Sequence, residues 1–248
     1  MAASCTTSYA HSCVSTEHRR PVATVAVFDL DGTLTHHDTL VPWWWRLFWQ
    51  PPALGVMARW AFRMRALARA VHSLLHYLIR RDRGQLKASL LYAVLSPWSA
   101  SQVAALAEHY VASLDASRFN AALVERLQQH QALGHRTILM SASVDCYVPL
   151  IAKRLRFDEC ICTTLEWRQG ALSGALAGEN VRGLVKLEHL KALQQRFAGA
   201  TFYAYGNAGS DLPHLRAVEH AFLVNASARD RRAAQRDHIA THLGAPLS

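Results

Sequence analysis

Residues 22–35 read Val-Ala-Thr-Val-Ala-Val-Phe-Asp-Leu-Asp-Gly-Thr-Leu-Thr, an apolar run followed by a polar turn. The apolar, β-branched part ends at Phe28 and is typical of a buried parallel strand. Asp-Leu-Asp-Gly is a turn signal, so Asp29 and Asp31 stand where this strand ends. Two carboxylates so close together repel each other unless a cation offsets their charge. Because their oxygens are hard ligands, the pair suggests Mg²⁺.

Beyond residue 115 short apolar strands alternate with helices. We expect strands over 136–140, 159–163, 201–205 and 221–224, helices over 120–133, 148–155, 183–197 and 211–218, and a hairpin over 165–176. Such alternation predicts an α/β fold with a parallel sheet covered on both faces. Ser141 and Asn207 follow strands, as Asp29 and Asp31 do. The sequence therefore predicts a site at the carboxyl edge of the sheet.

Between these parts lies a helical segment. Pro51-Pro52 and Arg83-Gly84 interrupt its pattern, and Ser99 with Gln102 resembles a capping box that opens a further helix. We therefore predict a disordered leader over 1–20, a catalytic core over 21–38 and 115–227, a helical cap over 39–114 and a polar C-terminal tail over 228–248.

Composition separates the cap from the rest of the chain. The chain has 248 residues and a net charge of +9, and nine basic residues but one acid lie between Arg46 and Lys87. The slightly longer stretch 42–87 holds five of the seven tryptophans. The five cysteines are an odd number without a C-x-x-C pair, which argues against a disulfide framework and favours a reducing cytoplasm.

The basic, aromatic stretch 42–87 has three interpretations. Its tryptophans are cap core and its arginines the solvated face; or the stretch contacts an anionic membrane surface peripherally; or it binds nucleic acid. We expect no nucleic acid, because no recognised module accompanies the stretch. A spanning helix is not expected either, since arginines bracket too short an apolar run.

The run Asp29-Leu30-Asp31-Gly32-Thr33-Leu34-Thr35 resembles the first motif of the haloacid dehalogenase (HAD) superfamily, D-x-D-G-T-L-T. Later features follow in that family's order: Ser141 after an apolar strand, Lys186 in a helix, and residues 205–211, where the family pattern is G-D-x-x-x-D. The resemblance covers about 24–224. It implies a three-layer Rossmann-like core with a parallel sheet and an all-helical C1-type cap inserted after the first strand.

The resemblance also implies a phosphatase mechanism. Asp29 is expected to be the nucleophile that forms an aspartyl-phosphate. Asp31 is expected to be the general acid and then the general base. Lys186 is expected to neutralise charge on Asp29 and on the phosphoryl group. Thr33 and Ser141 are expected to hold phosphoryl oxygens.

Four further assignments concern the metal and the substrate. Mg²⁺ is expected to bind Asp29, the main-chain carbonyl of Asp31, Asn207 and Asp211, although Asp211 is also suited to orienting Lys186. Asn207 stands where the family usually has Asp, so we expect weaker magnesium binding. Arg182 lies close to Lys186 and is a candidate for phosphate binding. Ser143 either assists Ser141 or caps a helix.

An all-helical cap at this position in the chain resembles the caps of the phosphoserine-phosphatase-like branch of the superfamily, subclass IB. Within it, residues 35–40 and 178–186 look closest to a group that includes the C-type phosphatidylglycerophosphatases. Asp38 matches a position that contacts substrate in phosphoserine phosphatases, or it caps the following helix. The implied substrate is a lipid phosphate such as phosphatidylglycerophosphate or a small phosphomonoester such as phosphoserine. The implied location is cytoplasmic, including the inner membrane face. The alternative is a weak or inactive member of the family that binds anionic membranes.

Overall fold

The computed structural model describes residues 23–49 and 55–247. Its centre is a five-stranded sheet in the order β3-β2-β1-β6-β7, with every neighbouring pair parallel. The strands are β1 (Thr24–Phe28), β2 (Arg136–Val144), β3 (Glu159–Thr163), β6 (Thr201–Gly206) and β7 (His220–Leu223). The predicted α/β class is confirmed. The leader predicted over 1–20 lies outside the described residues.

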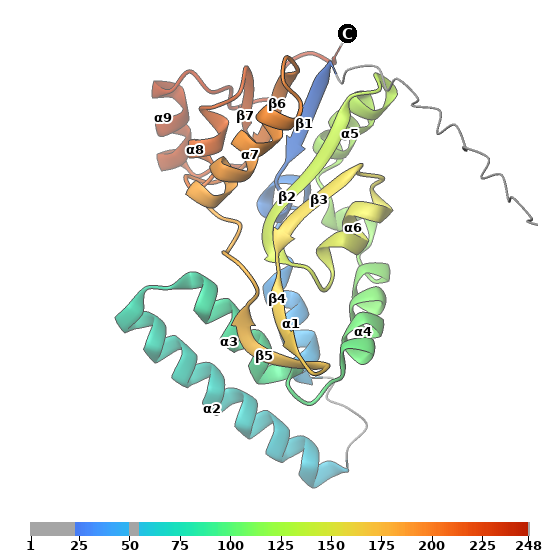
Figure 1. The fold of residues 1–248 in the computed structure, drawn as a ribbon, viewed down its shortest axis with the longest axis vertical. Helices are drawn as coiled ribbons and strands as arrows, with labels where there is room; N and C mark the ends of the chain where they lie inside the picture. The colour runs from blue at the N-terminus through green and yellow to red at the C-terminus, as the bar shows by residue number, and fades with distance from the viewer. Residues whose placement is uncertain (1–22, 50–54, 248) are drawn as a thin grey trace, which may run out of the picture.

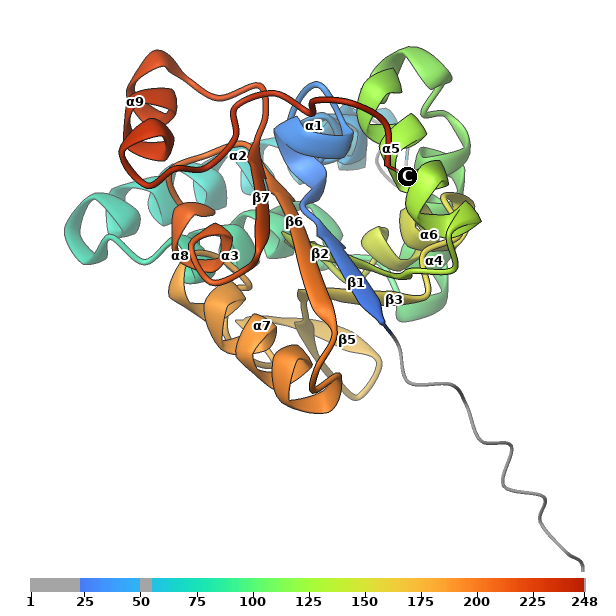
Figure 2. The ribbon, with the colours of Figure 1, turned by 90° about the horizontal axis from the view of Figure 1, so that it is seen from above.

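Helices cover both faces of the sheet (Figure 2). Side chains alternate along β1: Ala26 and Phe28 join the hydrophobic cluster of α5 and α6, whereas Val25 and Val27 join that of α7, α8 and α9. These helices are α5 (Ala121–Ala132), α6 (Val148–Arg154), α7 (Leu184–Arg196), α8 (Leu212–Leu215) and α9 (Ala228–Arg236). A central strand that is apolar on both faces therefore yields the predicted three layers.

The cap lies beyond the carboxyl edge of the sheet (Figure 1). It contains α1 (Leu40–Trp49), α2 (Val56–Arg80), α3 (Arg83–Leu95) and α4 (Ala100–Ala112). The predicted hairpin is present as β4 (Leu165–Arg168) and β5 (Ala171–Leu176). It packs against α3: a side chain on Gly174 would lie 3.3 Å from the Tyr92 ring. The inserted segment is helical as expected, and a hairpin from the core sequence completes the cap layer.

The cap tryptophans do not share one environment. Trp43 is 1% exposed, and its ring centroid lies 4.9 Å from that of Tyr147. Trp45, Trp49 and Trp60 are 48%, 58% and 59% exposed. The core interpretation therefore holds for Trp43 but does not account for the three exposed rings.

Several predicted boundaries are wrong by a few residues. The break predicted at Arg83-Gly84 falls at Arg81, which adopts φ 58°, and α3 begins immediately after Asp82. The Asp82 side chain accepts the Gln85 N–H at 2.9 Å, as an N-cap does. The Ser99–Gln102 capping box is confirmed.

Two later elements also differ from expectation. β2 continues past Met140 to Val144, because Ser141 still pairs with Cys162 of β3. The helix predicted over 211–218 is reduced to α8.

The segment predicted as a polar tail folds onto the core. It forms α9, in which Ala234 is buried, and then returns so that Ala240 accepts the Leu223 N–H at 2.7 Å. Arg126 is itself buried and donates to the carbonyls of Leu243 and Ala245. Apolar residues spaced within a polar stretch, Ala234 and Ile239, make this docking favourable.

Among residues 23–49 and 55–247, no single helix is both long and apolar enough to cross a bilayer. Judged by length and composition only, α3 and α4 together meet the criterion for a membrane span, although the two helices are bent by 99° relative to each other.

Candidate active site

Asp29 is fixed at the end of β1 by its own backbone and by the turn that follows. Its N–H donates to the Tyr205 carbonyl at 2.9 Å, which ties it to β6. The turn over Leu30–Leu34 closes when the Thr35 N–H donates to the Leu30 carbonyl at 3.0 Å. Gly32 has φ 77°, and a Cβ there would lie 2.0 Å from Nδ2 of Asn207. Glycine is therefore required, because the turn and Asn207 come this close.

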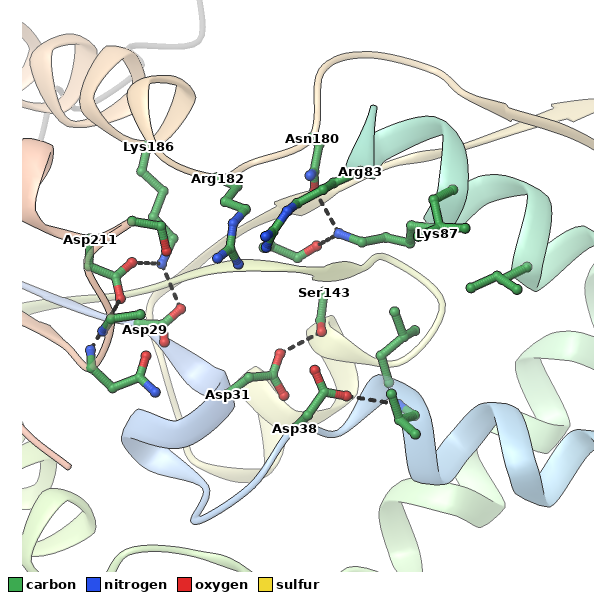
Figure 3. Close-up of a pocket in the computed structure, with 18 of the residues that line it drawn as sticks. Asp29, Asp31, Asp38, Arg83, Lys87, Ser143, Asn180, Arg182, Lys186 and Asp211 are labelled. Carbon is green, nitrogen blue, oxygen red and sulfur yellow. Dashed lines mark hydrogen bonds and ion pairs between the residues drawn. The ribbon is translucent and has the colours of Figure 1, made fainter. Parts of the chain in front are cut away.

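A buried lysine joins two carboxylates at the centre of the site (Figure 3). The Lys186 ammonium lies 2.6 Å from Oδ1 of Asp29 and 2.8 Å from Oδ1 of Asp211. The other oxygen of Asp29 accepts the Thr33 hydroxyl at 2.9 Å. The other oxygen of Asp211 accepts the N–H groups of Asn207 and Ala208, each at 3.1 Å. The four residues are 0–6% exposed, so each charge is held by partners rather than by water.

Burial and charge act in opposite directions on these groups. Burial raises the pKa of Asp29 to about 7, against the attraction of Lys186 and with added repulsion from Asp211. At Asp211 burial also opposes ionisation, but Lys186, His214 and the hydrogen bonds hold its pKa at about 2. Burial alone would lower the pKa of Lys186, yet the two carboxylates raise it above its ordinary value. Asp211 therefore keeps Lys186 charged beside Asp29.

Asp31 lies in a separate network at the junction of core and cap. One of its oxygens accepts both the N–H and the hydroxyl of Thr39, at 2.7 and 2.6 Å. The other accepts the Ser143 hydroxyl at 2.5 Å. Burial, and next the charge of Asp38, raise the pKa of Asp31. A carboxyl with a raised pKa is suited to donating a proton near neutral pH.

These groups line one cavity of about 440 Å³ between core and cap. Its wall includes seven of the predicted site residues: Asp29, Asp31, Asp38, Arg182, Lys186, Asn207 and Asp211. Lys186, and not Arg182, pairs with Asp29. The Asp38 carboxylate accepts the Val41 N–H at 2.8 Å, so its capping role is confirmed, and its contact with substrate stays a prediction.

Thr33 and Ser141 take less direct positions. Both are fully buried, and neither forms part of the cavity wall. Thr33 donates to Asp29, and Ser141 accepts the Ser143 N–H at 3.0 Å. Ala142 and Ser143 form the wall beside them. The prediction that these two hydroxyls hold phosphoryl oxygens stays a prediction, whereas Ser143 reaches Asp31 directly.

Among the wall residues that sequence reasoning missed are Arg83, Lys87 and Asn180. The Lys87 ammonium donates to the Ala142 carbonyl and, at 2.6 Å, to Oδ1 of Asn180, so it joins the cap to the core (Figure 3). Burial lowers the pKa of Lys87 to about 8. Arg83 and Lys87 are four residues apart, so they share one helix face. That spacing was visible, but which face meets the site was not.

The oxygen donors of this wall fit a hard cation. Each Asp29 oxygen has one hydrogen bond and keeps a second acceptor position. The Asn207 amide and Asp31 line the same cavity. Within the described residues no three His, Cys, Asp or Glu side chains converge on one point, so a metal site here would need main-chain and amide oxygens. Asp211 is already engaged by Lys186 and two N–H groups and is better placed to orient than to ligate.

Known proteins resemble this chain in sequence or in fold. Protein CicA of Caulobacter vibrioides is 28% identical over 192 residues, which cover 77% of this chain and 81% of CicA. A Bordetella pertussis protein of unknown function superposes with a TM-score of 0.71 at 22% identity, covering 88% of this chain and 97% of that one. A phospho-aspartyl intermediate analogue of phosphoserine phosphatase superposes with a TM-score of 0.56 at 16% identity, covering 84% and 90%.

The family model of the haloacid dehalogenase-like hydrolases matches residues 26–216. That range includes Asp29, Ser141, Lys186 and Asp211, together with strands β2, β3 and β6 and helix α7. The expected resemblance is thus confirmed over most of the chain. The chain belongs to the haloacid dehalogenase-like hydrolases.

Proposed function

We propose that this protein is a magnesium-dependent phosphomonoester hydrolase that works through an aspartyl-phosphate on Asp29. The observation that supports this most is the pairing of Asp29 with a buried lysine in the cavity that also holds Asp31. A fixed carboxylate beside a fixed cation, with a second carboxyl of raised pKa nearby, is suited to nucleophilic displacement with proton transfer. The shared fold includes a phosphoserine phosphatase, which is compatible with this reaction class.

The proposed reaction has two steps. The Asp29 carboxylate attacks phosphorus, the ester P–O bond breaks, and Asp31 gives its proton to the leaving alcohol oxygen. Water then attacks phosphorus in the aspartyl-phosphate, Asp31 accepts the water proton, and phosphate leaves with Asp29 restored. Lys186 offsets the charge that develops on the phosphoryl oxygens. Hydrogen bonds from Thr39 and Ser143 hold the Asp31 carboxyl in place for both transfers.

Asp29, the Asp31 carbonyl and Asn207 would hold Mg²⁺, with Asp211 behind them. When bound, the ion supplies positive charge to the phosphoryl oxygens and favours the ionised form of Asp29. This matters because burial raises the pKa of Asp29 to about 7, so part of the protein would otherwise lack an ionised nucleophile at neutral pH.

A neighbouring cavity bears on the substrate. It has a volume of about 220 Å³, and its wall is almost entirely apolar, with Trp44, Trp45 and Leu91. Leu40, Val41, Lys87 and Leu90 border both cavities. A phosphomonoester with an apolar chain, such as a lipid phosphate, can place its phosphate at Asp29 and its chain in this neighbouring apolar cavity. Phosphoserine has no group that would fill it, so we favour the lipid phosphate.

The test is hydrolysis of p-nitrophenyl phosphate with Mg²⁺. Asp29→Asn should lower turnover by about a thousandfold or more, because the nucleophile is lost. The exposed Asp115→Asn serves as the matched control and should leave turnover unchanged. Mass spectrometry of acid-quenched protein should find phosphate on Asp29. If wild type and Asp29→Asn are equally inert with every divalent metal, the phosphatase proposal is wrong.

Substrate class is tested separately. Trp45→Ala removes an apolar side chain from the wall of the neighbouring apolar cavity. It should raise KM for a short-chain lipid phosphate while leaving KM for p-nitrophenyl phosphate unchanged. Equal effects on both substrates, or faster turnover of phosphoserine than of the lipid phosphate, would rule out the preference for an apolar chain.

A further inference from the structure

The outer helix of the cap, α2, carries an apolar stripe on the side that faces solvent. Ten large apolar side chains of α2 are each at least 47% exposed: Val56, Met57, Trp60, Met64, Leu67, Val71, Leu74, Leu75, Leu78 and Ile79. At 3.6 residues per turn all of them except Ile79 fall within an arc of about 100°, and Ile79 lies about 40° beyond it. The residues of α2 that pack inward are Phe62, Ala66 and Ser73, on the other side of the helix. The stripe therefore contributes nothing to the core of the chain.

The position of α2 leaves this stripe accessible. Figure 1 shows α2 along the outer edge of the cap, on the side away from the sheet. A contiguous apolar surface of this size on a folded chain marks a surface that contacts something else. Ordinary surface helices turn such a stripe toward the core.

Basic side chains border the stripe on both sides. By helix geometry Arg59 and Arg63 flank one edge and Arg65 lies beyond the other, whereas the Arg69 guanidinium packs over the Tyr92 ring of α3. No acidic residue occurs in 56–80. The Arg63 guanidinium lies 4.8 Å from the centre of the Trp49 ring, and Trp49 is 58% exposed. An exposed indole therefore adjoins the stripe on the Arg63 side.

Charge identifies the partner. A second copy of this chain would bring two arginine-bordered helices together without an acidic residue on either, and the like charges would repel. An anionic bilayer suits both parts of the surface. The apolar stripe enters the boundary with the acyl chains, the indoles lie at headgroup level, and the arginines reach lipid phosphates.

We propose that α2, together with Trp49, is a docking surface for an anionic lipid bilayer, on which the helix lies parallel to the membrane plane. Tyr77, next to Leu78 on α2, lines the cavity that holds Asp29. Docking would thus place the membrane beside one wall of the site. The proposal concerns binding alone and does not depend on the phosphatase activity.

The experiment is flotation of the full chain with vesicles of phosphatidylglycerol and phosphatidylcholine, compared with vesicles of phosphatidylcholine alone, at low and high salt. Leu67→Glu and Leu74→Glu change side chains that are 47% and 52% exposed, so we expect both variants to fold. Leu133→Glu, on a leucine that is 45% exposed at the end of α5, is the matched control. Circular dichroism checks the fold of each variant, and Asp29→Asn shows whether binding is separate from catalysis.

We expect wild type, Leu133→Glu and Asp29→Asn to float with anionic vesicles and to bind them less at high salt. Leu67→Glu and Leu74→Glu should each weaken binding at least about tenfold. Arg59→Gln with Arg65→Gln should weaken it about 25-fold, at about fivefold for each arginine. The proposal is overturned if wild type does not float with anionic vesicles, or if the leucine variants float as wild type does. It is equally overturned if the stripe instead forms a dimer, shown by light scattering as a dimer that Leu67→Glu dissociates and vesicles do not.

Discussion

Replacing Lys186 by methionine removes the cation between two buried carboxylates and keeps most of the side-chain volume. Lys186 is 2% exposed and lies 2.6 and 2.8 Å from Asp29 and Asp211, which are 6% and 3% exposed. Removing one partner from a buried ion pair costs about 3–5 kcal/mol, because the remaining charge is left without compensation. The unfolding free energy of a domain is only about 5–15 kcal/mol, so the loss should be large.

The size of this loss should depend on pH. Without Lys186, burial dominates at both carboxylates. The folded pKa of Asp29, already about 7 in the wild type, rises further, and the folded pKa of Asp211 rises above the unfolded value of about 3.9. A group with a raised folded pKa holds more protons in the folded than in the unfolded state, so its contribution to stability falls as pH rises. In the wild type Lys186 contributes to holding the pKa of Asp211 at about 2, so Asp211 is ionised throughout the pH range of the assay described below. The loss should therefore be full near pH 8 and shrink toward acid by about 1.4 kcal/mol per pH unit for each carboxylate that protonates.

The assay is urea unfolding of both proteins at several pH values between about 5 and 8, with EDTA present. The control is Lys186→Met combined with Asp29→Asn and Asp211→Asn, in which no carboxylate remains to protonate. Its stability relative to wild type should lack the steep fall toward pH 8 seen in the single variant. A loss below about 1 kcal/mol at pH 8, or one that does not change with pH, would refute the buried ion triad.

Three further predictions concern the cavity wall. Asn207→Asp restores a charge beside Asp29 and should lower the magnesium concentration for half-maximal turnover about tenfold or more; an unchanged requirement would exclude Asn207 as a ligand. Asp38→Asn keeps a helix cap but removes the charge that raises the pKa of Asp31, so the alkaline limb of kcat/KM should move to lower pH if Asp31 donates its proton. Lys87→Met removes two hydrogen bonds between cap and core and should lower kcat/KM about tenfold to a hundredfold, mainly through KM; an unchanged KM would place Lys87 outside substrate binding.

The local sequence determined the core and the position of Asp29 in it. The alternation of strands and helices after residue 115 required a parallel sheet covered on both faces, and the run at residues 22–35 placed Asp29 at its carboxyl edge. Helix caps could also be predicted, as at Ser99, because hydrogen bonds between residues three apart depend only on neighbours in the chain. The ends of the elements were harder to predict from the sequence. β2 extends to Val144 because it pairs with β3, and this pairing leaves no signal in the local sequence.

The tertiary structure alone decided how distant residues share partners. Lys186 meets Asp29 across 157 positions of sequence, and only their distance distinguishes it from Arg182. Lys87 is one of nine basic residues in the region 46–87, and it reaches the site because α3 turns its face toward Ala142. The tryptophans show the same limit, since Trp43 is buried and Trp45, two residues later, is exposed. Sequence fixes the chemistry of each side chain, but packing against elements far along the chain sets its neighbours, its solvent and hence its pKa.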